Sequence, residues 1–67
     1  MPFLVSAIAE VYNNEGNDEF KKKEFNNAIQ FYTEGIKVNC NDTELKAKLF
    51  SNRATAHFYL GKMQFFV

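Results

Sequence analysis

The sequence has one cysteine, no tryptophan, no excess of charge of either sign and no long apolar run. Its single thiol, Cys40, cannot form a disulfide within the chain, so we expect an ordinary linker cysteine in a reducing, cytoplasmic or nuclear compartment. Eight basic and eight acidic residues give a formal net charge of zero, which argues against nucleic acid as a partner because phosphate binding needs a basic excess. No segment approaches the length of a membrane span, so we expect no membrane partner.

The residue patterns that support catalysis or metal binding are also missing. His57 is the one histidine, and no cysteine pair or histidine–carboxylate spacing suggests a metal site. No glycine-rich loop suggests phosphate binding. We therefore expect no cofactor, no metal and no enzymatic activity, with His57 as a packed or partly exposed ring.

Apolar residues recur at three- and four-residue steps and predict three antiparallel helices near residues 5–22, 25–38 and 43–60. The predicted fold class is all-α. Residues 1–4 should form an irregular start, Gly61 should mark a turn after the third helix, and residues 64–67 are too few for another helix. The buried edge of the first helix is predicted at Ile8, Tyr12, Gly16 and Phe20. The second helix has the apolar stripe Phe25, Ala28, Ile29, Tyr32, Gly35 and Ile36.

Asparagines and one aspartate separate the second and third predicted helices. Asn tolerates left-handed turns, and both residue types cap helices. Asn41, followed three residues later by Glu44, has the spacing of a capping box. The sequence therefore predicts a helix that begins just after Asn41.

The third predicted helix repeats the first at an offset of 38 residues, because Phe50 corresponds to Tyr12 and Ala54 to Gly16. Tyr12, Gly16, Ala28 and Tyr32 also fit the spacing of the tetratricopeptide (TPR) repeat, whose usual period is 34 residues. The chain thus resembles a TPR repeat, although three pattern positions hold other residues: Glu15, Glu19 and Cys40. The resemblance implies a helical-hairpin repeat divided into an N-terminal extension (1–8), a first repeat (9–41), an incomplete second repeat (42–63) and a non-matching tail (64–67). We therefore expect a truncated TPR domain.

In an array of such hairpins the first helices line a concave groove. The expected lining on the first helix is Glu10, Asn13, Asn17 and Phe20, and on the third helix it is Lys48, Asn52, Thr55 and Phe58 or Tyr59. Side-chain amides can donate hydrogen bonds to a carboxylate or a peptide backbone. From the residues alone, Asn17 and Asn52 are therefore candidate binding residues, or simply solvated amides.

Asn17 and the segment Ser51-Asn52-Arg53 resemble the signature of carboxylate-clamp TPR domains, which are found in co-chaperones of heat-shock protein 90. The resemblance implies that Asn17 and Asn52 hold the terminal carboxylate of a heat-shock protein 90 or 70 tail ending Glu-Glu-Val-Asp. Asn13 stands where that family usually has lysine, and the remaining basic clamp residues belong to a following repeat. Arg53 should point away from Asn52, as an interhelix or surface residue.

Two other readings remain open from the sequence. The chain could be a TPR scaffold with another protein partner, or a structural piece that binds no peptide. The predicted third helix lacks a neighbour on its outer side, so we expect an exposed apolar patch that favours self-association. Its candidate members are Leu45, Leu49, Leu60, Met63, Phe65 and Phe66.

Overall fold

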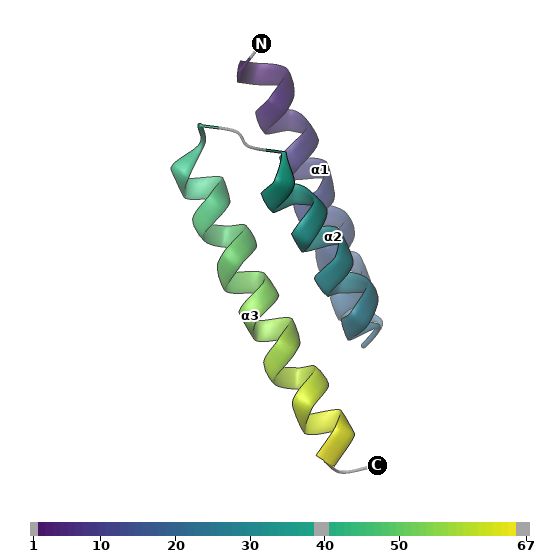
Figure 1. The fold of residues 1–67 in the computed structure, drawn as a ribbon. Coiled ribbons are helices and arrows are strands. Elements are labelled where there is room, and N and C mark those ends of the chain that lie inside the picture. The colour runs from purple at the N-terminus through teal and green to yellow at the C-terminus, as the bar shows by residue number, and fades with distance from the viewer. Residues whose placement is uncertain (1, 39–40, 66–67) are drawn as a thin grey trace.

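The computed structural model describes the backbone of residues 2–38 and 41–65, with side chains from Val5 onward. The described segments contain three helices and no strand: α1 (Pro2–Lys21), α2 (Phe25–Lys37) and α3 (Thr43–Phe65). The chain turns back on itself twice, so neighbouring helices are antiparallel (Figure 1). Helix α2 packs extensively against both α1 and α3, whereas α1 and α3 contact each other less. The predicted all-α helical-hairpin architecture is confirmed.

Small residues allow the three helices to approach closely. Ala9 of α1, Ala28 of α2 and Ala56 of α3 are completely buried. Gly35 of α2 lies against both neighbours, because a Cβ placed there would be 2.7 Å from the Leu49 side chain of α3 and 3.2 Å from Tyr12 of α1. The core therefore forms where small side chains of one helix accept larger ones from the next.

The apolar stripe of α2 is confirmed, with four buried members and two partly buried ones. The stripe of α1 is partly wrong. Ile8, expected on the buried edge, is 44% exposed, and the adjacent Ala9 is buried instead. Both residues fit a helical stripe through Gly16, but the close approach of the helices favours the smaller side chain. Gly16 is buried as expected.

The turn between α1 and α2 ends α1 in a Schellman motif. Lys23 has a positive φ of 64°. Its N–H donates to Phe20 O (2.9 Å), and the Glu24 N–H donates to Glu19 O (2.9 Å). The Lys22 ammonium and the Asn27 amide both donate to the Glu19 carboxylate. These bonds lower the pKa of Glu19, and the bond from Lys22 has the largest effect. These bonds confirm the predicted tight turn.

The predicted ends of the other helices need three corrections. Helix α1 already begins at Pro2, since proline suits the first position of a helix, where its missing N–H costs no hydrogen bond. Helix α3 is capped by Asp42 rather than Asn41, because Asp42 Oδ1 accepts the Leu45 N–H (3.0 Å). Helix α3 also passes through Gly61 to Phe65, so Gly61 marks no turn and residues 64–65 are helical. The predicted tail residues 66–67 lie outside the described residues, as does Cys40.

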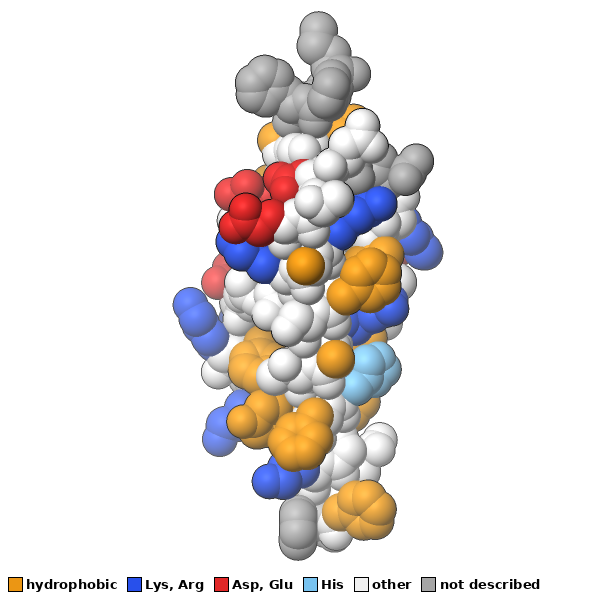
Figure 2. Space-filling model, turned by 90° about the vertical axis from the view of Figure 1, so that its left-hand side faces the viewer, with side chains coloured by type: hydrophobic (Ala, Val, Ile, Leu, Met, Phe, Trp, Pro, Cys, Tyr) orange, Lys and Arg blue, Asp and Glu red, His pale blue; other side chains and the backbone are white. Residues whose placement is uncertain are grey.

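The expected apolar patch is also partly wrong. Leu45 and Leu49 are buried, because α3 turns them toward α2 and α1. Met63 and Phe65 are exposed as predicted, and Phe66 lies outside the described residues. The large apolar side chains exposed on α3 are Phe50, Phe58, Tyr59, Met63 and Phe65. Figure 2 shows apolar side chains following one another along the outward face of α3.

None of the helices in the described part of the chain is both long enough and apolar enough to cross a membrane.

Candidate functional site

Three carboxamides from two helices meet between α1 and α3. Asn13 and Asn17 lie four residues apart and therefore on one face of α1. Across from them, Asn52 of α3 donates through Nδ2 to Oδ1 of Asn13 (3.0 Å) and to Oδ1 of Asn17 (3.4 Å). Asn13 is buried, with 6% of its surface exposed, and the other two are half-buried. The structure thus brings together the two asparagines that the sequence singled out, with Asn13 beside them.

Helix α2 supplies a fourth member of this cluster, Tyr32. Its hydroxyl donates to Asn17 Oδ1 over 2.6 Å, and the ring itself is 1% exposed. Burial raises the pKa of Tyr32, so the phenol stays protonated and remains a donor. From the sequence, Tyr32 was assigned only to packing. The repeat pattern contains both Tyr32 and Gly16, and this pairing could have indicated the contact. Gly16 leaves the space in which the Tyr32 ring reaches Asn17.

One end of this site is a depression of about 270 Å³. Its base is aromatic, since the Phe20 ring packs edge-on against Phe25 (5.2 Å between centroids) and Tyr59 (5.6 Å). Lys21 is its one charged residue. The lining residues are Asn17, Phe20, Lys21, Tyr32, Asn52 and Thr55. We call this depression the Lys21 end; it contains the expected lining residues Phe20 and Thr55, together with Lys21, which was not among the expected lining residues.

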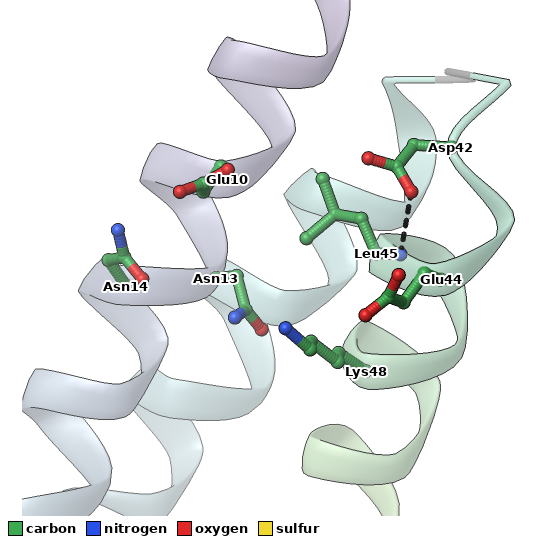
Figure 3. Close-up of a pocket in the computed structure, with 7 residues that line it drawn as sticks. All are labelled: Glu10, Asn13, Asn14, Asp42, Glu44, Leu45 and Lys48. Atoms are coloured by element: carbon green, nitrogen blue, oxygen red, sulfur yellow. Dashed lines mark hydrogen bonds between the residues drawn. The ribbon is translucent and has the colours of Figure 1, made fainter.

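The opposite end is a second depression, of about 260 Å³ (Figure 3). Three carboxylates and one ammonium surround it, so its formal charge is negative. Figure 3 shows Lys48 of α3 extending toward Asn13 across the gap between the helices. The lining residues are Glu10, Asn13, Asn14, Asp42, Glu44, Leu45 and Lys48. We call this depression the acidic end; the expected lining residues Asn13 and Lys48 both lie here.

Phe58, also expected in the groove, lies beside another surface depression with His57, Gly61, Lys62 and Phe65. Its ring is 60% exposed and packs edge-on against Tyr59 (5.4 Å), and the Lys62 ammonium lies 5.3 Å from its centroid. Of the two aromatic candidates on α3, Tyr59 is the one that contacts Phe20 of α1. His57 is exposed, as one of the predicted alternatives allowed.

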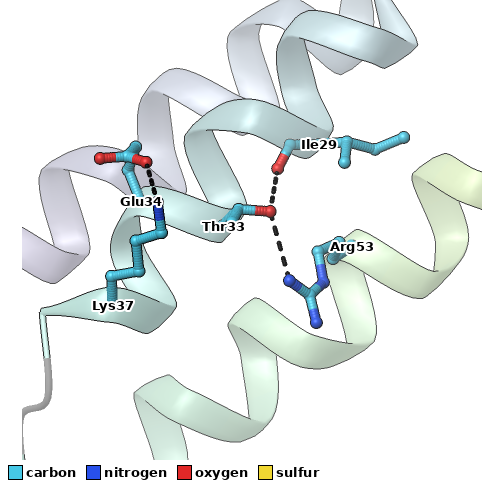
Figure 4. Close-up of polar contacts among 5 residues, drawn as sticks. All are labelled: Ile29, Thr33, Glu34, Lys37 and Arg53. Carbon is cyan, nitrogen blue, oxygen red and sulfur yellow. Dashed lines mark hydrogen bonds and ion pairs between the residues drawn. The ribbon is translucent and has the colours of Figure 1, made fainter.

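Arg53 of α3 points toward Thr33 of α2 (Figure 4). Its guanidinium donates to Thr33 Oγ1 (3.2 Å), and the same hydroxyl donates to Ile29 O (2.7 Å). The guanidinium also lies 5.4 Å from the centroid of the Phe50 ring. The predicted interhelix position of Arg53 is confirmed.

Several known proteins have sequences similar to that of this chain. The chain is 48% identical over 56 residues to human tetratricopeptide repeat protein 4. It is 36% identical over 53 residues to the Hsp70/Hsp90 co-chaperone CNS1 of Saccharomyces cerevisiae, and 47% identical over 49 residues to Hsp70-Hsp90 organizing protein 1 of Arabidopsis thaliana. These matches cover 84%, 79% and 73% of this chain.

The matched region is a small part of each relative, amounting to 14% of the human and yeast proteins and 8% of the plant protein. No family model and no solved structure matches the chain. The helical hairpin, the repeat spacing and the similarity over most of the chain nevertheless agree with one another. Together they identify the chain as a tetratricopeptide-repeat segment of the co-chaperone type, similar to tetratricopeptide repeat protein 4.

Proposed function

We propose that the chain is a protein–protein interaction module whose groove between α1 and α3 docks the acidic C-terminal peptide of a heat-shock protein 90 or 70 chaperone. The observation that carries this proposal is the carboxamide cluster, in which Asn17 and Asn52 from two helices meet beside the Lys21 end. The names of the yeast and plant relatives include Hsp70 and Hsp90, which supports the choice of partner. We further propose that it acts in the cytoplasm and is not an enzyme.

The binding should be weak. A hydrogen bond to a charged group contributes about 1.5–3 kcal/mol, and association itself costs at least about 4 kcal/mol. Two amide contacts and the single ammonium of Lys21 therefore leave little net free energy, and the three carboxylates of the acidic end oppose an acidic ligand. We expect a dissociation constant in the millimolar range for this chain.

Nuclear magnetic resonance titration detects binding of this strength. A peptide ending Glu-Glu-Val-Asp should shift the side-chain amide signals of Asn17 and Asn52 and the backbone signal of Lys21. A peptide of the same length with basic residues in place of the two glutamates is the control and should leave the Lys21 signal unshifted. Unchanged signals at a peptide concentration of several millimolar would refute the proposal.

A second candidate function is a structural segment that associates through its apolar surface. The exposed rings of Phe58 and Phe65 on α3 favour it. Sedimentation velocity distinguishes this candidate, because association through α3 depends on protein concentration and does not depend on added peptide.

A further inference from the structure

The hydrogen bonds within the carboxamide cluster fix which atoms remain for a ligand. The Tyr32–Asn17 distance of 2.6 Å is typical of an O–H···O bond, so Asn17 directs its oxygen toward Tyr32 and leaves its NH₂ group free to donate. Asn52 uses both hydrogens of its Nδ2 on the oxygens of Asn13 and Asn17. Asn52 therefore offers its Oδ1, an acceptor, to a ligand.

A pair consisting of one donor and one acceptor does not suit a carboxylate. An ionised carboxylate only accepts hydrogen bonds, so the Asn17 NH₂ would attract it and the Asn52 oxygen would repel it. In an extended chain the N–H and the C=O of one residue point to the same side, so they can bond to both groups at once. The cluster is thus complementary to the backbone of an extended chain.

Charge along the groove places the acidic side chains of such a peptide. The Lys21 end holds an ammonium as its one charged lining group, whereas the acidic end holds Glu10, Asp42 and Glu44 against Lys48. Figure 2 shows acidic side chains gathered toward one end of the visible face and basic side chains along its whole length. Carboxylates of a bound peptide are therefore favoured at the Lys21 end.

We propose that Asn17 and Asn52 bind the backbone N–H and C=O of one residue within an extended acidic peptide, and not its terminal carboxylate, and that Asn13 determines this preference. Asn13 has this effect because it is buried and its side-chain oxygen accepts a hydrogen bond from the Asn52 amide, which leaves that N–H unavailable to a ligand. Lysine at this position has no acceptor, so it would release that donor and add a positive charge. This inference rests on the function proposed above and specifies which part of the ligand the site recognises.

The test compares the free acid and the C-terminal amide of one peptide ending Glu-Glu-Val-Asp, by nuclear magnetic resonance titration of the labelled 67-residue chain. The wild type should bind the two forms with dissociation constants within a factor of two. Asn13→Lys should prefer the free acid by a factor of ten or more. Asn14→Lys is the matched control, because it adds the same charge at the neighbouring exposed position and leaves the Asn13–Asn52 bond intact. It should show less than a threefold preference.

Asn13 is buried, so Asn13→Ala serves as a second variant if the lysine variant does not fold. Without the Asn13 oxygen, the side-chain NH₂ signal of Asn52 should shift in the free protein, and a preference of at least threefold for the free acid should appear. A tenfold loss of wild-type affinity on amidation would overturn the inference and leave the proposed function intact. If the wild type binds neither form, the proposed function fails. The inference then fails with it, because it concerns the part of a bound peptide that the wild-type site recognises.

Discussion

Gly16 offers a strong test of how the hairpin is packed. A Cβ added at Gly16 would lie 2.6 Å from Cδ1 and 2.9 Å from Cζ of Tyr32. The ring cannot easily withdraw, because it is 1% exposed and its hydroxyl is bonded to Asn17. Overpacking of this kind costs about 1–3 kcal/mol, whereas replacing a helical glycine with alanine contributes about 1 kcal/mol in helix propensity. We expect Gly16→Ala to destabilise the chain by up to about 2 kcal/mol, which is the overpacking cost less the gain in helix propensity.

Gly61 provides the control for this substitution. It also lies within a helix, but a Cβ added there meets nothing within 4 Å. Gly61→Ala should therefore stabilise the chain by up to about 1 kcal/mol through helix propensity alone. In thermal unfolding followed by circular dichroism, the two variants should differ in Tm by on the order of 10 °C for a domain of this size.

A double variant tests whether the cost arises from the Tyr32 ring. Tyr32→Leu should reduce the penalty of Gly16→Ala, since the two residues are in direct contact and their effects are then not additive. The reasoning is wrong if Gly16→Ala raises Tm as Gly61→Ala does, or if its cost is the same with leucine at position 32.

Lys23→Gly should stabilise the chain by about 1 kcal/mol, because glycine removes the steric cost of the left-handed conformation at φ 64°; Lys23→Ala keeps a Cβ and should leave the urea midpoint unchanged. Burial raises the pKa of Tyr32, so its contribution to stability is constant below the unfolded pKa of about 10 and is lost as the pH rises through the higher folded value. Urea unfolding should show this loss above about pH 10, and Tyr32→Phe should reduce it. Exposed Phe58 and Phe65 predict concentration-dependent association in sedimentation, weakened in Phe65→Lys; a monomer at every concentration would contradict this.

Periodicity predicted the helices well but predicted their ends poorly. The stripe of α2 was correct because its apolar residues face two neighbours, so burial follows the full pattern. Gly61 was misread as a stop because glycine disfavours a helix by only about 1 kcal/mol, which the good helix formers after it offset. A choice between adjacent residues, such as Ile8 and Ala9, depends on how closely α2 approaches, and the period alone does not report that distance.

The candidate site was likewise predicted only in part. Repeat spacing was enough to predict that Asn17 and Asn52 share a groove, and the hydrogen bond between them agrees with that expectation. Spacing could not predict which amide atoms face outward, because that depends on Tyr32 and on the burial of Asn13. A binding role for these residues remains a prediction. Their pattern of hydrogen-bond donors and acceptors determines which ligand should be tested.

The packing of the hairpin and the chemistry of the groove depend on the same contact. Gly16 admits the Tyr32 ring, the Tyr32 hydroxyl orients Asn17, and Asn17 accepts a hydrogen bond from Asn52 on the third helix. Displacing the ring should therefore affect more than stability, because Asn17 would lose its strongest partner and could rotate. In Gly16→Ala at a temperature where it remains folded, the side-chain amide signals of Asn17 and Asn52 should shift together. In Gly61→Ala the same amide signals should not shift, because a Cβ at Gly61 meets neither Tyr32 nor the asparagines.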